Sequence, residues 1–257
     1  MTTKKLVVGN WKMNPQSLED AKRIARKTRA AAAKLKATEA VICPPFVFIS
    51  ACAPRRRASH FYLGAQSVSF ERDGPHTGQI GAPMLKDIGA DFVIAGHSEV
   101  RAEGETDADV SKEAKAILEA GMTPIICVGE QKRDESGAHF DFVREQIKGS
   151  LADIPKKFSW NIVIAYEPIW AIGAEEAMGP EAINEMSIFV KKIFADIFGT
   201  DSAMKVAVLY GGSVHSRNAA DILKIGRVDG LLVGRESVSS TGFVELLTAV
   251  DLSARTI

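Results

Sequence analysis

The feature that most constrains the fold is the alternation of short apolar runs with amphipathic segments along the whole chain. Parallel strands that are covered on both faces read as continuous apolar runs of this length. Strands that alternate with helices are typical of an α/β protein with a parallel sheet. The eight predicted strands are Leu6–Asn10, Ala40–Cys43, Phe61–Ala65, Phe92–Ala95, Pro124–Val128, Ile162–Tyr166, Val206–Tyr210 and Gly230–Val233.

The segments between these runs carry apolar residues at helical spacing. Ser17 and Asp20 resemble a capping box that opens a helix reaching Leu35. After Pro180, apolar residues recur every three or four positions as far as Ile197. Helical patterns also fit Asp107–Ala120, Phe140–Leu151, Ser216–Leu223 and Gly242–Leu252.

Length decides between the two architectures that such an alternation permits. The chain has 257 residues, which is the usual size of one closed (β/α)8 barrel. No linker or low-complexity segment interrupts it, so we expect a single domain over residues 1–257. A doubly wound open sheet is the alternative, but eight strands in this length favour the barrel.

Composition narrows the possible partners. Lys+Arg and Asp+Glu are 32 each, and a net charge of zero argues against binding nucleic acid or an anionic membrane. No apolar run approaches the length of a signal peptide or a membrane span. Cys43, Cys52 and Cys127 are an odd number without metal-type spacing, which suits free thiols in the cytoplasm. We expect no metal and no cofactor, and we expect His60, His76 and His215 on the surface.

The end of the sixth predicted strand carries a candidate catalytic group. Glu167 follows the apolar run directly, and Pro168 holds it in extended geometry and ends the strand. An ionisable group at the carboxyl end of a strand is where α/β proteins place chemistry. The loop that follows, Ala171 to Gly179, is rich in small residues and could move over the site.

Polar residues gather just beyond four other strand ends as well. Each alone has an ordinary explanation: a lysine in a turn is usually solvated, a histidine after a strand is usually structural, and two glycines usually make a turn. In a barrel, however, these ends converge on one face, so residues far apart in sequence become neighbours. The residues concerned are Asn10 and Lys12, His97 and Glu99, Ser213 after Gly211-Gly212, and Gly234 with Arg235.

Together these residues resemble the triosephosphate isomerase family, in order and spacing, over nearly the whole chain. The fold implied is the TIM barrel. The stretches that carry the resemblance are Gly9-Asn10-Trp11-Lys12-Met13-Asn14, Gly64-Ala65-Gln66, Thr77-Gly78, Ala95-Gly96-His97-Ser98-Glu99, Cys127-Val128-Gly129-Glu130, Tyr166 to Gly173, and Tyr210-Gly211-Gly212-Ser213.

The resemblance implies a cofactor-independent isomerase that interconverts dihydroxyacetone phosphate and D-glyceraldehyde 3-phosphate through an enediolate. Glu167 would move the proton between adjacent carbons. His97, as a neutral imidazole, would stabilise the developing oxyanion together with Lys12 and Asn10. Glu99 would orient this cluster or exchange protons within it.

The resemblance also assigns the rest of the site. Gly173, Ser213 and Gly234 match the family's phosphate-contacting positions, and Arg235 follows them. The loop Ile169–Gly179 would close over the substrate and exclude water. A homodimer is implied, because Thr77 lies on the loop that reaches into the neighbouring subunit in this family.

Three departures from the family pattern stand out. The lid reads Ala174-Glu175-Glu176 where the family usually has Thr-Gly-Lys, so two carboxylates would lie beside the incoming dianion. Arg235 stands where the family usually has a glycine. Either Arg235 or Lys12 would offset these carboxylates, or Arg235 would point to solvent or pair with Glu236. Gln79 and Val100 replace the family's usual ion pair near the subunit contact, where losing both partners costs less than stranding one charge.

Two alternative functions are also compatible with the sequence. The altered lid and Arg235 permit a barrel that binds sugar phosphate but isomerises it poorly, whereas intact Asn10, Lys12, His97 and Glu167 argue against that. A different phosphosugar enzyme would share the phosphate loops but not the pair of Glu167 and His97. Cys127 is expected to pack behind the site.

Overall fold

Eight parallel strands close into one barrel in the computed structural model, which describes residues 4–54, 58–133, 136–174 and 177–256. The strands pair in sequence order and β8 returns to β1, which excludes the open sheet. Each predicted strand is confirmed to within two residues at either end. The strands are β1 (Lys5–Asn10), β2 (Thr38–Cys43), β3 (Phe61–Ala65), β4 (Phe92–Ala95), β5 (Thr123–Val128), β6 (Val163–Tyr166), β7 (Ala207–Gly211) and β8 (Gly230–Val233).

The strands are apolar throughout because both of their faces are buried. In β1, Val8 belongs to the cluster that fills the barrel, whereas its neighbour Val7 packs outward into the larger layer under the helices. Cys127 on β5 also points into the barrel interior. The barrel is therefore a packed core, and its open chemistry is confined to its ends.

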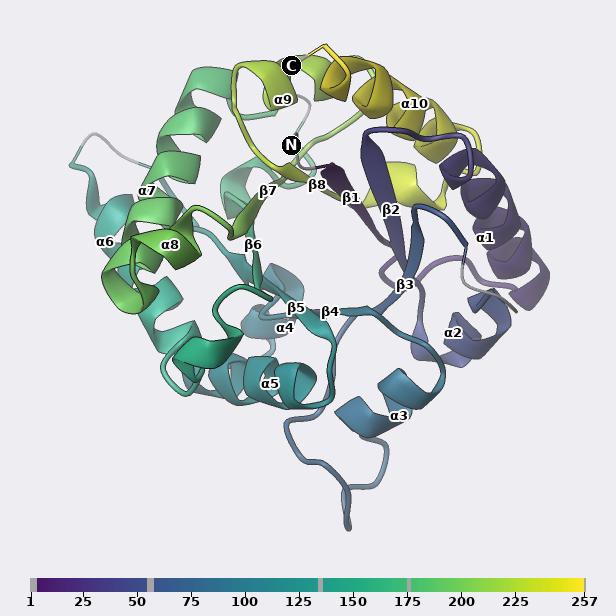
Figure 1. Cartoon of the computed structure of the whole chain (residues 1–257). Helices are drawn as coiled ribbons and strands as arrows, with labels where there is room; N and C mark the ends of the chain where they lie inside the picture. The colour runs from purple at the N-terminus through teal and green to yellow at the C-terminus, as the bar shows by residue number, and fades with distance from the viewer. Residues whose placement is uncertain (1–3, 55–57, 134–135, 175–176, 257) are drawn as a thin grey trace.

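The helices form a ring around the barrel (Figure 1). The Ser17 side chain accepts the Asp20 N–H, so the predicted cap is confirmed, but the helix ends at Ala32 rather than Leu35. Four short helices had no prediction: α2 (Phe46–Cys52), α3 (Ala82–Asp87), α4 (Ser98–Ala102) and α8 (Thr200–Ala203). The others are α1 (Leu18–Ala32), α5 (Asp107–Glu119), α6 (Ala138–Ser150), α7 (Pro180–Phe198), α9 (Ala219–Lys224) and α10 (Gly242–Ala254), with three short 3-10 helices, η1 (Lys156–Phe158), η2 (Ile169–Ala171) and η3 (Arg235–Val238).

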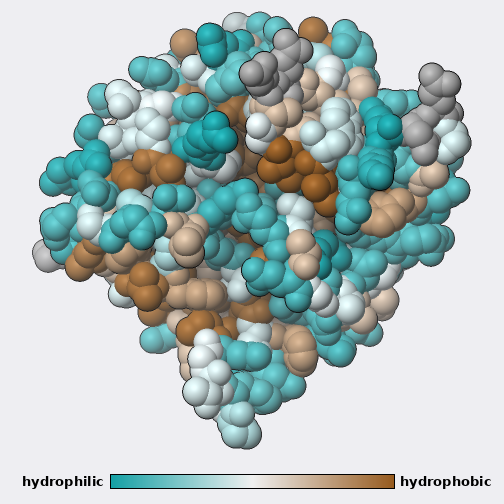
Figure 2. All heavy atoms as spheres, turned by 180° about the vertical axis from the view of Figure 1, so that it is seen from behind, coloured by the Kyte–Doolittle hydropathy of each residue, from teal (hydrophilic) through white to brown (hydrophobic). Residues whose placement is uncertain are grey.

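One loop departs from the compact outline. The segment between β3 and α3 extends away from the barrel at the bottom of Figure 1, and Thr77 on it is exposed. From the opposite side the same loop projects, and the surface above it is mostly hydrophilic with separate hydrophobic patches (Figure 2). Within the described residues, no helix combines the length and hydrophobicity needed to cross a membrane.

Candidate active site

A cavity of about 600 Å³ opens at the carboxyl ends of the strands. It collects residues from loops far apart in the sequence, as the barrel topology predicts. Eight of the nine predicted site residues line it, and the ninth, Glu99, contacts it through Lys12. The eight are Asn10, Lys12, His97, Glu167, Gly173, Ser213, Gly234 and Arg235.

Glu167 is fixed by the barrel itself. Its N–H donates to the carbonyl of Val128 at 2.8 Å, which continues the pairing of β5 and β6 by one residue. Two glycines make room for it: a Cβ on Gly129 would lie 1.9 Å from the Glu167 carbonyl oxygen, and one on Gly211 would lie 2.7 Å from Glu167 Cγ. The side chain therefore has a defined place, and the residue is only 5% exposed.

His97 faces Glu167 across the cavity. His97 Nε2 lies 3.5 Å from Glu167 Oε1. On the other side of the ring, Nδ1 accepts the backbone N–H of Glu99 at 3.2 Å, so it carries no hydrogen. A neutral imidazole then has its proton on Nε2, which points at the cavity.

The second oxygen of Glu167 is unoccupied. Oε2 is buried and has no hydrogen-bond donor among the described residues. A buried carboxylate oxygen without a donor is costly for folding, and such oxygens persist where function needs them. The arrangement offers a carboxylate oxygen free to accept a proton beside a fixed N–H donor.

Lys12 is held in an uncommon conformation. Its φ of 51° lies in the left-handed region, which costs a non-glycine residue about 1–2 kcal/mol. Hydrogen bonds hold it there: Lys12 N–H donates to Asn10 Oδ1 at 3.0 Å, and Gln66 Nε2 donates to the Lys12 carbonyl at 2.9 Å. The side chain reaches Glu99, with Nζ 2.5 Å from Oε1. Backbone strain at a site residue is typical of a position built for function.

Three other residues that line the cavity present backbone donors. The N–H groups of Gly173, Ser213 and Gly234 have no acceptor among the described residues. Gly234 also lies against Lys12, because a Cβ added to it would be 3.6 Å from Lys12 Cε. Open N–H groups next to a lysine form a site for an oxyanion such as phosphate.

Arg235 follows Gly234 at the rim of this cavity. It is exposed and forms no ion pair with a described residue, so the expected pairing with Glu236 is absent from this part of the chain. Its charge is therefore available to the cavity mouth. The lid carboxylates that it would offset, Glu175 and Glu176, lie outside the described residues.

The loop after β6 is tied down at both ends. Trp170 Nε1 donates to Glu130 Oε1 at 3.0 Å near its start, and Met178 N–H donates to the Tyr210 hydroxyl at 3.0 Å near its end. Between them, the Ser213 hydroxyl donates to the carbonyl of Ala174 at 2.5 Å. The described part of the loop thus lies against the site.

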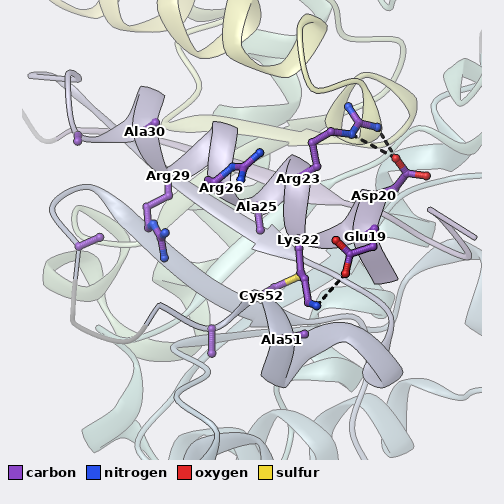
Figure 3. Close-up of a pocket in the computed structure, with 13 residues that line it drawn as sticks. Glu19, Asp20, Lys22, Arg23, Ala25, Arg26, Arg29, Ala30, Ala51 and Cys52 are labelled. Atoms are coloured by element: carbon purple, nitrogen blue, oxygen red, sulfur yellow. Dashed lines mark hydrogen bonds and ion pairs between the residues drawn. The ribbon is translucent and has the colours of Figure 1, made fainter. Parts of the chain in front are cut away.

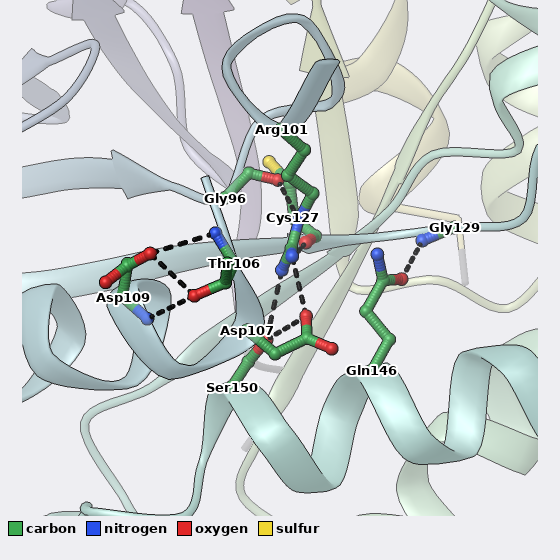
Figure 4. A network of polar contacts seen from close by, with 9 residues as sticks. All are labelled: Gly96, Arg101, Thr106, Asp107, Asp109, Cys127, Gly129, Gln146 and Ser150. Carbon is green, nitrogen blue, oxygen red and sulfur yellow. Dashed lines mark hydrogen bonds and ion pairs between the residues drawn. The ribbon is translucent and has the colours of Figure 1, made fainter. Parts of the chain in front are cut away.

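Beneath the cavity, an arginine network supports the loop that carries His97 (Figure 4). Arg101 Nε donates to the Gly96 carbonyl at 2.7 Å, and Nη1 pairs with Asp107 at 2.6 Å. Cys127 is buried behind the site, as expected. Burial, and then the adjacent Glu167 carboxylate, hold the pKa of its thiol well above the usual range.

Some features of the site are not readable from the sequence. His215 was expected on the surface, but it is half-buried and lines the cavity, and its backbone N–H donates to Asn218 Oδ1 at 2.9 Å. His76 is exposed as expected, and His60 is half-buried. Gln66, which clamps Lys12, had no assigned role. The contact between Gln66 and Lys12 joins residues far apart in the sequence, so no local sequence pattern predicts it.

A larger hollow of about 1000 Å³ lies between α1 and α2 on the outside of the barrel (Figure 3). Two ion pairs lie on it, with Lys22 Nζ 2.9 Å from Glu19 Oε1 and Arg23 2.5 Å from Asp20, and Arg26 and Arg29 add further positive charge. It holds no group aligned for catalysis. Among the residues described, no cluster of three His, Cys, Asp or Glu side chains could hold a metal ion.

Comparison with known proteins agrees with this geometry. Residues 5–250 match the family model described as triosephosphate isomerase. A triosephosphate isomerase of Endomicrobium trichonymphae is 39% identical over 95% of this chain and 98% of its own, and one of Rhodopirellula baltica is 39% identical over 97% and 98%. The crystal structure of the triosephosphate isomerase from Bartonella henselae superposes with a TM-score of 0.84 at 34% identity, covering 96% of this chain and 98% of that one. The chain belongs to the triosephosphate isomerase family.

Proposed function

We propose that the cavity at the strand ends carries out the family's reaction with the residues named above. The chain interconverts dihydroxyacetone phosphate and D-glyceraldehyde 3-phosphate, a step of glycolysis and gluconeogenesis. The reaction removes a proton from the carbon next to a carbonyl and returns it one carbon away. The observation that carries the residue assignment is the approach of His97 Nε2 to within 3.5 Å of Glu167 Oε1, between two buried side chains that line the cavity.

Glu167 is the base. Its carboxylate takes the proton from the carbon beside the carbonyl, and the electron pair moves onto the oxygen to give an enediolate. The protonated Glu167 then returns the proton to the neighbouring carbon, while a proton shifts between the two substrate oxygens. The donor-free Oε2 supports this role, because an oxygen without a hydrogen bond is the better proton acceptor.

His97 and Lys12 stabilise the oxyanion. The Nε2–H of His97 donates to the oxygen as charge develops, and the fixed ring requires little reorganisation. Lys12 supplies a positive charge, and Asn10 fixes the loop that carries it through the Lys12 N–H. Glu99 orients both partners, since it contacts Lys12 Nζ through its side chain and His97 Nδ1 through its backbone N–H.

The phosphate binds at the other end of the cavity. Gly173, Ser213 and Gly234 line the cavity with N–H groups that have no acceptor among the described residues, and Lys12 lies beside Gly234. Arg235 adds a charge at the rim. A dianion held chiefly by backbone dipoles suits a chain of zero net charge.

The loop after β6 acts as the lid. Its anchors at Trp170 and Met178 support closure over the enediolate, which eliminates phosphate if water reaches it. The lid therefore protects the intermediate as well as the substrate.

The protein acts as a cytoplasmic homodimer in this proposal. The β3–α3 loop with Thr77 projects far enough to contact a second copy (Figure 1). Val47 on α2 and Met84 on α3 are 78% and 54% exposed; α3 lies next to the loop, and α2 is the next helix in the ring (Figure 1). The free thiols of Cys43, Cys52 and Cys127 fit a reducing compartment.

The test is a coupled assay in both directions with wild type and Glu167→Gln. The substitution keeps the size of the side chain and removes the base, so we expect kcat to fall by about 10²–10⁴-fold with KM little changed. Glu181→Gln, at an exposed position of α7, is the matched control. Turnover that survives in Glu167→Gln would refute the base assignment, and no turnover of either triose by wild type would refute the function.

A further inference from the structure

The loop after β7 is held by the side chain of Asn218. Asn218 Nδ2 donates to the Ser213 carbonyl at 2.8 Å, and Asn218 Oδ1 accepts the His215 N–H at 2.9 Å. Only one orientation of the amide satisfies both partners, because a carbonyl needs a donor and an N–H needs an acceptor. One side chain therefore fixes the peptide bonds on both sides of Val214.

This use of Asn218 is not the ordinary one for its position. Asn218 is the N-cap of α9, where an asparagine usually accepts an N–H from the first turn of its own helix. In this described part of the chain, its side chain makes no such bond. The helix forgoes a capping hydrogen bond, and the amide serves the preceding loop instead.

The held peptide bonds orient the Ser213 N–H. The Val214 N–H, on a peptide bond that Asn218 fixes, donates to the Gly212 carbonyl at 2.9 Å. In a planar trans peptide the C=O and the N–H point in opposite directions, so holding the Gly212 carbonyl fixes the direction of the Ser213 N–H. That N–H has no acceptor among the described residues, and Ser213 lines the cavity. The direction of this open donor therefore depends on Asn218.

The other polar groups of Ser213 are already engaged. Its hydroxyl donates to the carbonyl of Ala174 at 2.5 Å, in the loop after β6, and its carbonyl accepts the Asn218 amide. Ser213 thus contacts the lid with its side chain and keeps its N–H for the cavity. Asn218 is not one of the described residues that line the cavity, so it acts through Ser213.

We propose that Asn218 is a positioning residue for phosphate binding: its amide holds the loop after β7 so that the Ser213 N–H is aligned with the substrate phosphate. The inference rests on the proposed function, which places the phosphate at Ser213. Without the amide, the peptide bonds beside Val214 lose their fixed orientation. The phosphate is then held by fewer aligned donors.

Asn218→Ala tests this proposal through the separate responses of KM and kcat. The variant loses both hydrogen bonds and adds no charge near the dianion. We expect KM for both triose phosphates to rise by about threefold to tenfold, with kcat changed by less than about twofold. The inhibition constant of inorganic phosphate, used as a competitive inhibitor, should rise by the same factor. Merely structural damage would instead lower kcat through loss of folded enzyme and leave both binding constants unchanged.

Asn161→Ala is the matched control. Asn161 Nδ2 donates to the Met122 carbonyl at 3.2 Å, and its Oδ1 accepts the Thr123 hydroxyl at 2.9 Å, so it also bridges two groups through one amide. Asn161 precedes β6 and therefore lies at the opposite end of the barrel from the cavity. KM and the inhibition constant of phosphate should stay within about twofold of wild type in this variant.

Two results would overturn the proposal: wild-type values of KM and of the phosphate inhibition constant in Asn218→Ala, or equal increases in Asn161→Ala. If Asn218→Ala does not fold, Asn218→Ser takes its place, because serine is a good N-cap for α9 but its single hydroxyl cannot hold both backbone groups. Wild-type turnover separates this test from that of the function. Only failure of the function abolishes it, whereas failure of this proposal leaves the wild type active and the variant with unchanged binding constants.

Discussion

The ammonium of Lys12 lies 2.5 Å from the Glu99 carboxylate, and Glu99 in turn donates its backbone N–H to His97 Nδ1. One residue thus contacts both proposed electrophiles. The Glu99 side chain is 58% exposed, so solvent screens its pairing with Lys12 and the pair contributes little to stability. The role of the Glu99 carboxylate is instead to hold the Lys12 ammonium near the cavity.

Removing the cation should harm activity far more than removing its partner. We expect Lys12→Met to lower kcat/KM by at least about 10³-fold, because the variant loses the positive charge that attracts the substrate phosphate and stabilises the developing oxyanion. Glu99→Gln should lower kcat/KM by about tenfold or less. Steady-state kinetics in both directions provide the measurement, with exposed Lys115→Met as control. Equal losses in Lys12→Met and Glu99→Gln would contradict this division of roles.

Gly211→Ala should displace the base. The added methyl group would lie 2.7 Å from Glu167 Cγ, so the carboxylate must shift. Because misplacement by about 1 Å costs roughly 10²-fold in rate, we expect kcat to fall by about 10–100-fold. A crystal structure of the variant should show the shifted side chain. Full activity with Glu167 unmoved would show that the glycine is not required there.

Arg235→Gln should weaken substrate binding modestly. Arg235 is exposed at the rim, so its attraction for the phosphate is screened, and we expect KM to rise by about twofold to fivefold at low salt. The difference should disappear in about 0.5 M salt, where the screening length is only a few ångströms. A KM equal to that of wild type at low salt would mean that the side chain only faces solvent.

Tyr210→Phe should loosen the lid. It removes the hydroxyl that accepts the Met178 N–H, which is worth about 1 kcal/mol. We expect kcat/KM to fall about fivefold and the release of inorganic phosphate per turnover to rise, because the enediolate is less protected. Tyr62→Phe, whose hydroxyl faces Glu39 instead, is the control. Unchanged phosphate release would argue against this anchor.

Glu113→Gln should stabilise the protein, increasingly so at higher pH. The pKa of Glu113 is raised in the folded state, to about 9 from an ordinary value of 4.5, so the native protein binds more protons than the unfolded chain between these limits. Wild-type stability therefore falls with pH across this window, by at most about 1.4 kcal/mol per unit, and the variant lacks this term. Urea unfolding of both proteins at pH 5, 7 and 9 measures the difference. A constant difference would show that Glu113 does not titrate there.

The sequence predicts the strands well for a physical reason. Residues such as Val7 and Val8 are buried on opposite faces of the same strand, so each strand appears as an unbroken apolar run. Helices of fewer than eight residues complete no more than two turns, so α2, α3, α4 and α8 show no clear period.

The site also has a part that the sequence predicts and a part that it does not. Residues at strand ends, such as Glu167 and His97, are predictable because parallel strands bring their ends to one face. The contacts of Gln66 with Lys12 and of Arg101 with Gly96 are not, since they depend on side-chain direction in loops. The raised pKa of Glu113 depends on burial, which composition does not reveal.

The hydrogen bond from the Glu167 N–H to the Val128 carbonyl marks the boundary between the barrel strands and the lid. These two parts of the chain differ in how well they tolerate substitutions. The carboxylate belongs to the rigid ladder, whereas the lid begins only after Pro168. Substitutions within the lid, such as Ala174 in this chain, can therefore accumulate without disturbing the alignment of the base. Evolution can retune how the substrate is covered while the proton-transfer geometry stays inherited from the barrel.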